Sequence, residues 1–519
     1  MNRFAGLIAA VMLSCAATTS IAAPAAPVVQ TTLGPVQGVD QGAATAFLGI
    51  PYAAPPVGDR RWREPAPPAP WTSVRPADHF ALNCPQPKLP IPGIDTKPMG
   101  EDCLYLNVWA PKHPHGKLPV MVWIHGGSYI LGSGDLDDTS AFTRDGVVLV
   151  SLNYRLGRLG FFAHPALTAE TPNGPLGDYG ILDQIAALKW VQANIARFGG
   201  DPARVTIFGV SAGATFTDML MTSPLATGLF AGAIAESDPF FQPWSYLASM
   251  HHVGEPTAED WGEGWAAAQG LPNASPADLR AVPFARTLAG PNEANVQQVK
   301  PIVDGHILPE RGPEAYAAGA IAQVPYIIGN NSFEGSLAAI YATDPTVNVA
   351  ALGANGPAIL RLYGPQITGN PSMLAATLTG DVSFLVPKRV AARLAAAHGV
   401  PTRVYHFAYV PEALRGKAPG APHGGEVPYV FEAFRAGPMQ PYAPTDADRA
   451  MAARMHAYWV NFARTGDPNG PGLPAWPRFT PDAQTLLQFS NDGVAPVSDF
   501  NQQLYDLIEP SVVGARPSH

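Results

Sequence analysis

The chain has 519 residues, of which 47% are hydrophobic and 14% are charged, and it contains 56 prolines and 51 glycines. This composition is typical of a globular protein with many loops and turns. The net charge of −9, without any basic run or stripe, argues against a nucleic-acid-binding protein.

The first 22 residues are expected to form a cleavable signal peptide. Asn2-Arg3 is a short basic start, Phe4 to Met12 is apolar, and Ser20-Ile21-Ala22 fits a small-x-small cleavage site with the cut after Ala22. The apolar run is too short to span a bilayer, and no other stretch is long enough. An alternative makes Cys15 a lipid-anchored N-terminus, although the residues before it fit that signal poorly. We therefore expect a secreted or periplasmic protein.

Removal of the signal leaves two cysteines, Cys84 and Cys103. An even count in an oxidising compartment favours a disulfide, with two free thiols as the alternative. A bridge between them would close a proline-rich loop and contribute on the order of 3 kcal/mol in the chain-entropy treatment.

Apolar patterning predicts strands that alternate with helices along the chain. The expected strands are 28–38, 43–52, 105–109, 118–124, 147–150, 232–236, 325–328 and 403–409, and the expected helices are 181–198, 258–269, 387–397 and 446–463. The run Leu118–Ile124 is almost continuously apolar, as expected of a strand that is buried on both faces. The alternation predicts an α/β protein with a mostly parallel sheet and helices on both faces. Without a repeat or linker, residues 23–519 read as one domain with lid and cap insertions.

One segment, from Thr206 to Ala214, reads as a strand, a sharp turn and the start of a helix. The turn is Gly209-Val210-Ser211-Ala212-Gly213, a Gly-x-Ser-x-Gly pattern. Glycines on both sides leave room for a tight backbone, which would hold the Ser211 hydroxyl above the sheet edge at a helix N-terminus. The segment therefore predicts a nucleophile elbow, with an ordinary strand-to-helix turn as the alternative.

A serine nucleophile needs a base and an orienting acid, which in this fold type follow it in the order serine, acid, histidine. Among the late histidines, His423 is the one in a glycine-rich loop after a strand, whereas the others fall in helices, in a strand or at the terminus. Glu334 follows the strand that ends at Ile328, where catalytic groups gather in open α/β sheets. Asp304 is the competing acid, although it also reads as a turn residue.

An oxyanion hole needs backbone amides directed at the developing charge. The Ala212 amide, directly after the nucleophile, is one candidate. The loop Ile124-His125-Gly126-Gly127-Ser128 follows the most apolar strand and predicts the others, because glycines allow the backbone to approach a substrate.

Several further segments occur in a fixed order through nearly the whole mature chain. They are Phe47-Leu48-Gly49-Ile50-Pro51-Tyr52-Ala53, Glu101-Asp102-Cys103-Leu104-Tyr105-Leu106-Asn107, Asn153-Tyr154-Arg155-Leu156-Gly157, Phe198-Gly199-Gly200-Asp201-Pro202, Pro301-Ile302-Val303-Asp304-Gly305 and Asn461-Phe462-Ala463-Arg464-Thr465-Gly466-Asp467-Pro468-Asn469. With them the chain resembles the type-B carboxylesterase family, which includes cholinesterases and bacterial para-nitrobenzyl esterases.

The resemblance implies an α/β-hydrolase fold and a catalytic triad, oxyanion hole and disulfide at defined positions. The implied triad is Ser211, Glu334 and His423; the implied oxyanion amides are those of Gly127, Ser128 and Ala212; and the implied bridge joins Cys84 to Cys103. No metal or organic cofactor is implied, and no Cys/His ligand spacing is present.

Departures from the family pattern bear on the substrate. Val210 stands where a glutamate is usual, which removes a negative field beside the nucleophile. The 84–103 loop has no aromatic residue, so the platform that holds a quaternary ammonium is missing there. Gln297 stands where the acyl pocket is often lined by bulky apolar residues, and Trp244 matches an acyl-pocket tryptophan, with ordinary core packing as its alternative.

These observations predict a serine esterase that hydrolyses uncharged carboxylic esters, small to medium or aromatic, through an acyl-enzyme. The alternatives are a choline-ester hydrolase and a non-catalytic binding module on the same fold. The expected partner is a small-molecule ester, without nucleic acid or a stable membrane span, and the expected state is a monomer or weak homodimer.

Overall fold

The computed structural model describes residues 27–88, 97–112, 116–172, 174–241, 244–250, 255–288, 299–337, 349–350, 352–435 and 442–513. The expected signal peptide, with Cys15 and the expected cleavage after Ala22, lies outside these residues.

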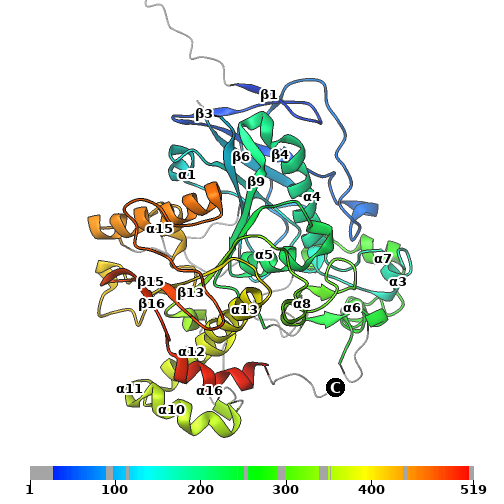
Figure 1. The fold of residues 1–519 in the computed structure, drawn as a ribbon. Coiled ribbons are helices and arrows are strands. Elements are labelled where there is room, and N and C mark those ends of the chain that lie inside the picture. The colour runs from blue at the N-terminus through cyan, green and yellow to red at the C-terminus, as the bar shows by residue number, and fades with distance from the viewer. Residues whose placement is uncertain are drawn as a thin grey trace, which may run out of the picture.

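The centre of the described structure is an 11-stranded sheet (Figure 1). Its strands in spatial order are β16 (Gly493–Val497), β15 (Leu486–Ser490), β14 (Thr402–Phe407), β13 (Tyr326–Asn331), β10 (Gly232–Glu236), β9 (Gly200–Val210), β7 (Leu118–Ile124), β8 (Val148–Leu152), β6 (Tyr105–Pro111), β4 (Ala44–Pro51) and β3 (Val39–Gln41). Neighbouring strands from β8 to β15 are parallel, and the pairs toward the two edges are antiparallel. The expected mostly parallel sheet is therefore confirmed.

The parallel register brings the carboxyl ends of several strands to one edge. Gly209 of β9 pairs with Ile124 of β7, and Val210 pairs with Glu236 of β10. Glu236 in turn pairs with Gly329 of β13. The segments that follow these strands therefore emerge side by side, and they carry most of the expected site residues.

Helices cover both faces of the sheet because side chains alternate along its strands. In β7, Val120 and Val122 belong to one buried apolar cluster, whereas Met121 and Trp123 belong to another. The first cluster includes α4 (Tyr179–Asn194), α5 (Ala212–Thr222) and α13 (Val386–Ala397), and the second includes α1 (Ser140–Arg144), α14 (Val427–Val430) and α15 (Asp446–Thr465).

A third buried cluster lies apart from the sheet and is built from helices (Figure 1, bottom). It contains α10 (Gly356–Tyr363), α12 (Pro371–Gly380), the π-helical turn Asp381–Leu385 and α16 (Gln502–Val513). The remaining elements are β1 (Val28–Gln30), β2 (Pro35–Gln37), β5 (Arg75–Pro76), α2 (Gly157–Gly160), α3 (Pro165–Thr168), β11 (Ser245–Tyr246), α6 (Ala258–Ala268), α7 (Pro276–Ala281), β12 (Ile302–Val303), α8 (Gly312–Ala318) and α11 (Pro365–Thr368).

The expected strand over 28–38 is wrong as a single element. A turn in which the Thr31 amide donates to the Gly34 carbonyl folds it into β1 and β2, which pair antiparallel. The strands expected at 118–124 and 232–236 have those bounds, and the expected helices appear with their ends shifted by a few residues.

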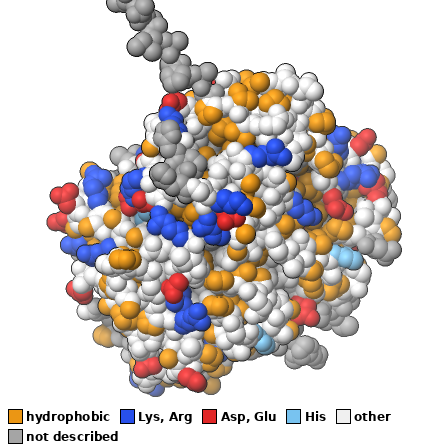
Figure 2. All heavy atoms as spheres, turned by 45° about the horizontal axis from the view of Figure 1, so that its top comes forward, with side chains coloured by type: hydrophobic (Ala, Val, Ile, Leu, Met, Phe, Trp, Pro, Cys, Tyr) orange, Lys and Arg blue, Asp and Glu red, His pale blue; other side chains and the backbone are white. Residues whose placement is uncertain are grey.

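On the surface shown in Figure 2, basic and acidic side chains lie among one another with apolar side chains between them. Within the described part of the chain, no helix combines the length and the apolar character that crossing a bilayer requires.

Candidate active site

Ser211 occupies a strained turn between β9 and α5. Its backbone has φ 59° and ψ −125°, a region that costs a non-glycine residue about 1–3 kcal/mol and that is found mostly at functional sites. The Ser211 amide donates a 2.8 Å hydrogen bond to the Glu236 carbonyl, and its own carbonyl accepts from the Thr215 amide at 3.0 Å. The turn is therefore fixed from both sides, as expected of a nucleophile elbow.

The two glycines of the elbow are required by close backbone contacts. A Cβ at Gly209 would lie 2.4 Å from the Ile124 carbonyl oxygen, and a Cβ at Gly213 would lie 2.1 Å from the same atom. Any larger residue would push α5 away from β7, so the sequence pattern follows from the packing of the elbow.

Glu334, which is buried, and His423, which is half-buried, form a pair at the same sheet edge. Glu334 begins a short 3-10 turn after β13, and its Oε2 accepts a hydrogen bond from His423 Nδ1 at 2.5 Å. Its Oε1 accepts from the Ser237 hydroxyl and the Asn331 amide, both at 2.6 Å. Among the described residues, His423 Nε2 is buried and has no hydrogen-bond partner.

The loops that carry this pair are tied to each other. The Phe333 amide donates to the Ala421 carbonyl at 2.8 Å, and the His423 amide donates to the Ser336 hydroxyl at 3.0 Å. The Phe384 ring, from the π-helical turn, packs against the imidazole with a centroid distance of 5.1 Å. These contacts fix the orientation of the imidazole.

Ser237 and Glu426 complete a network that sequence reasoning missed. Ser237 follows β10 directly and also has a positive φ of 59°. Its hydroxyl lies between two carboxylates, at 2.6 Å from Glu334 Oε1 and 3.0 Å from Glu426 Oε1. Because the Ser211 amide bonds to the residue before Ser237, Ser211 and Glu334 are linked through this segment. The position of Glu426 in the loop of His423 was the available sequence signal.

Burial and neighbouring charges shift the pKa values of the ionisable groups in this network. Burial lowers the pKa of His423, but the charge and hydrogen bond of Glu334 raise it, so that the net pKa lies above the ordinary 6.5. Burial and the charge of Glu334 raise the pKa of Glu426. The Glu236 carboxyl, which accepts from Trp459 Nε1 at 2.7 Å, has a pKa far above its usual range because of burial and the charge of Glu426.

The glycine-rich loop after β7 lies against the elbow. A Cβ at Gly126 would come within 2.6 Å of the Val210 carbonyl oxygen and 3.2 Å of Ser211 Cβ. Gly127 and Ser128 have φ values of 119° and 54°, and the Gly127 carbonyl accepts the amides of residues 130 and 131. Among the described residues, no acceptor bonds to the amide of Gly127 or of Ala212. The loop is thus a tight turn beside the serine.

His125 is buried and helps to hold this loop. Its imidazole stacks on the Tyr154 ring at 4.3 Å, and the Tyr154 hydroxyl donates to the His125 carbonyl at 2.6 Å. Burial lowers the pKa of His125 to about 4, so it is neutral at physiological pH.

The competing acid, Asp304, has a structural role. Its Oδ1 accepts the backbone amides of His306, Ile307 and Leu308, at 3.1, 2.7 and 3.0 Å, which is the pattern of a turn residue. This leaves Glu334 as the acid that meets His423.

The three expected pocket residues differ in what the structure shows. Val210 is half-buried beside Ser211. Trp244 is buried, and it flanks Gly312 together with Phe240. Gln297 lies outside the described residues.

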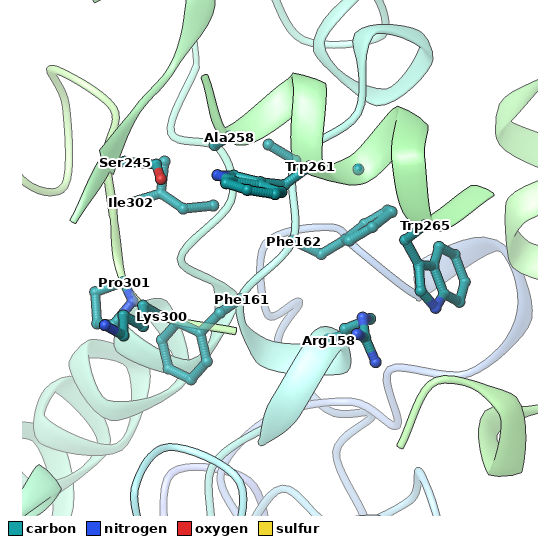
Figure 3. A pocket seen from close by; sticks show the side chains of 12 residues that line it. Arg158, Phe161, Phe162, Ser245, Ala258, Trp261, Trp265, Lys300, Pro301 and Ile302 are labelled. Carbon is teal, nitrogen blue, oxygen red and sulfur yellow. The ribbon is translucent and has the colours of Figure 1, made fainter. Parts of the chain in front are cut away.

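A pocket is formed by α6 and the segments 158–163 and 300–302 (Figure 3). Trp261 and Trp265 enter it from α6, and the Phe161 ring on its wall stacks on Phe216 of α5 at 5.6 Å. Its volume is about 20 Å³, which is close to the space that one water molecule needs. This pocket is therefore too small to hold an ester substrate.

The expected disulfide is present between Cys84 and Cys103, with a Cα–Cα distance of 5.0 Å. Within the described residues, no group of three or more His, Cys, Asp or Glu side chains is placed to hold a metal ion.

Comparisons with known proteins identify the family of the chain. The carboxylesterase family profile matches residues 25–353 and 367–506. Fumonisin B1 esterase from Sphingopyxis macrogoltabida is 38% identical over 463 residues, which cover 86% of this chain and 84% of the relative. Human cocaine esterase is 35% identical over 87% of this chain and 84% of the relative. A solved PNB esterase structure covers 93% of this chain and 99% of its own, with 30% identity and a TM-score of 0.77, which confirms the α/β-hydrolase fold. The chain therefore belongs to the carboxylesterase family and is a carboxylic ester hydrolase.

Proposed function

We propose that the chain hydrolyses esters through a triad of Ser211, Glu334 and His423. The observation that carries this proposal is the partly buried hydrogen bond between Glu334 and His423 Nδ1, at the sheet edge where Ser211 occupies its strained turn. In this proposal, His423 Nε2 takes the proton of the Ser211 hydroxyl as the serine attacks the ester carbonyl, and then gives it to the leaving alcohol. Glu334 holds the imidazole and stabilises its charged form. Water activated by His423 then hydrolyses the acyl-enzyme.

The amides of Gly127, Ser128 and Ala212 would bind the oxyanion of each tetrahedral intermediate. The close approach of the Gly126 position to Ser211 supports this role. The start of α5 at Ala212 adds the favourable end of a helix dipole.

The proposed substrates are uncharged esters of small to medium or aromatic acids. Val210, beside the nucleophile, provides no negative charge that would attract a cationic alcohol, and the loop between the disulfide cysteines has no aromatic residue. Choline esters are thus disfavoured. The names of the relatives, fumonisin B1 esterase and cocaine esterase, describe esters of different chemistry, so they support the reaction type rather than one substrate.

We also propose that residues 23–519 form a single domain that is exported after cleavage behind Ala22, and that it acts as a monomer or weak homodimer. The disulfide supports export, because such bonds persist in oxidising compartments.

Replacement of the serine tests the triad. Ser211→Ala should abolish hydrolysis of a short para-nitrophenyl ester with little change in melting temperature, and a phosphonate probe should label wild type at Ser211 alone. Ser223→Ala, at the other end of α5, is the matched control, because in the described structure its hydroxyl has no hydrogen-bond partner. Turnover by the Ser211→Ala variant, or labelling of a different serine, would overturn the assignment.

A further inference from the structure

Asp218 and Asp238 are two buried acidic residues that the proposed triad does not use. Asp218 lies in α5, ~two helical turns after Ser211. Asp238 follows Ser237 in the segment after β10. Their exposed fractions are 4% and 1%, so both carboxyl groups are removed from solvent.

The carboxyl groups of these residues interact with each other and with neighbouring hydroxyls. Asp218 Oδ1 accepts from the hydroxyls of Tyr326 at 2.6 Å and Tyr316 at 3.0 Å, and Asp238 Oδ1 accepts from the Thr215 hydroxyl at 2.6 Å. Each group keeps an Oδ2 atom that has no hydrogen-bond partner among the described residues. The two side chains are close enough that a hydrogen bond between them contributes to the pKa of each. A bond between two carboxyl groups requires a proton on one of them.

The surroundings favour the retention of this proton. The ionisable groups that face the pair are Tyr316 from α8 and Tyr326 from β13, and no basic side chain in the described structure bonds to either carboxyl. Burial raises the pKa of Asp218, and burial together with the charge of Asp218 raises the pKa of Asp238 well above its usual range. Both shifts favour the state in which one carboxyl of the pair keeps its proton.

The pair joins the nucleophile helix to the segment that holds the acid. The Thr215 hydroxyl that donates to Asp238 also lies 3.3 Å from the Ser211 carbonyl oxygen. Asp238 follows Ser237, whose hydroxyl donates to Glu334. Movement of Asp238 relative to α5 would therefore shift Ser211 relative to the Glu334–His423 pair.

We propose that Asp218 and Asp238 share one proton and act as positioning residues for Ser211, and that loss of this proton sets the alkaline limit of ester hydrolysis. The inference rests on the proposed triad. When the proton leaves, two carboxylates face each other in a buried site and repel, and the link between α5 and the segment after β10 is lost.

Asparagine substitutions can keep a hydrogen bond between residues 218 and 238 while removing the proton that the carboxyl pair could lose. In Asp238→Asn, the amide oxygen can still accept from Thr215 while the amide nitrogen donates to Asp218, so the bond remains without a proton to lose. Asp218→Asn does the same in the opposite direction. In the double variant, two amide nitrogens face each other, so the bond is lost at every pH.

The test is kcat and KM for a non-ionising para-nitrophenyl ester across neutral and alkaline pH. We expect wild-type kcat to fall about tenfold for each pH unit beyond its alkaline midpoint. The single variants should keep kcat in that range, and the double variant should have a low kcat throughout with little change in KM. The infrared difference spectrum of wild type minus Asp238→Asn should contain the carbonyl band of a protonated carboxylic acid.

The shared proton would be refuted by a wild-type kcat that does not fall at alkaline pH, or by an alkaline fall that both single variants share with wild type. It would also be refuted if the carbonyl band were missing from the infrared difference spectrum. Phosphonate labelling separates this failure from failure of the triad. If wild type is labelled at Ser211 but the single variants lose activity at alkaline pH as wild type does, the proposal for the Asp218–Asp238 pair alone is refuted. If wild type is not labelled at Ser211, the triad is refuted.

Discussion

The imidazole of His423 couples the proposed chemistry to pH. As a general base it must be neutral at Nε2, so hydrolysis should be lost as pH falls through its pKa. That pKa is raised above the ordinary 6.5, because the charge and hydrogen bond of Glu334 outweigh burial. We therefore expect the acid midpoint of kcat/KM to lie above 6.5, as a pH profile with a non-ionising ester would measure.

Glu334→Gln provides the matched comparison for this midpoint. Removal of the carboxylate leaves burial as the main influence, so the acid midpoint should move below that of wild type. We expect kcat to fall by about 10⁴-fold, the loss measured for the corresponding amide substitution in a Ser-His-Asp triad. Glu426→Gln, which removes a more distant charge, should move the midpoint less. An equal midpoint in wild type and Glu334→Gln would contradict this account.

Val210 is the second residue whose effect can be isolated. Val210→Glu would place a carboxylate beside the nucleophile, which should favour cationic alcohols through charge attraction. We expect kcat/KM for a choline ester to rise relative to that for a neutral ester of the same acid. Val210→Gln is the uncharged control of the same shape, and an equal ratio for the two variants would show that this position does not set charge preference.

At the scale of elements, the elbow depends on the contact between α5 and β7. Gly213→Ala would place a Cβ 2.1 Å from the Ile124 carbonyl oxygen, so we expect a loss of roughly 1–3 kcal/mol of stability and of most activity. Gly264→Ala in α6 is the control, because its Cβ would meet nothing within 4 Å. It should stabilise the protein by about 0.5–1 kcal/mol in denaturant unfolding. Equal stability of the two variants would contradict the packing argument.

The elements that could be predicted from sequence are those with strong local signals. β10 is buried throughout, β7 is buried at every residue after Leu118, and α15 begins with a Thr445–Asp448 capping box. The edge strand β16 was missed because its residues are half-buried or exposed and include Pro496, and α16 was missed because it contains Pro510. In such elements packing partners, rather than local pattern, decide the structure.

The candidate site divides in the same way. Ser211 and His423 could be predicted because both lie in glycine-rich turns that are recognisable in the sequence. The structure brings Glu334 to His423, as expected. Ser237 and Asp238 lie in no recognisable sequence motif and could not be predicted. Their contacts arise only because β10 lies between β9 and β13 in the folded sheet. The catalytic roles themselves remain predictions.

At the scale of the whole molecule, the disulfide joins two cysteines with a sequence separation of 19. A Cys84→Ser/Cys103→Ser variant should lose on the order of 3 kcal/mol of unfolding free energy, because its unfolded chain gains entropy. Urea unfolding of this variant and of wild type, each with and without reductant, measures the effect. Reductant should destabilise only wild type, and an equal response of both proteins would show that the bridge contributes nothing.

The strand order of the large sheet has a consequence for biosynthesis. Apart from the exchange of β7 and β8, the strands follow the chain from one edge of the sheet to the other. A chain made from its N-terminus can therefore extend an existing sheet edge strand by strand. Ser211 is synthesised directly after β9, whereas Glu334 is synthesised only after β13 and His423 only after β14. On the proposed triad, an unfinished chain holds a serine without its base, and hydrolysis begins only when synthesis is nearly complete.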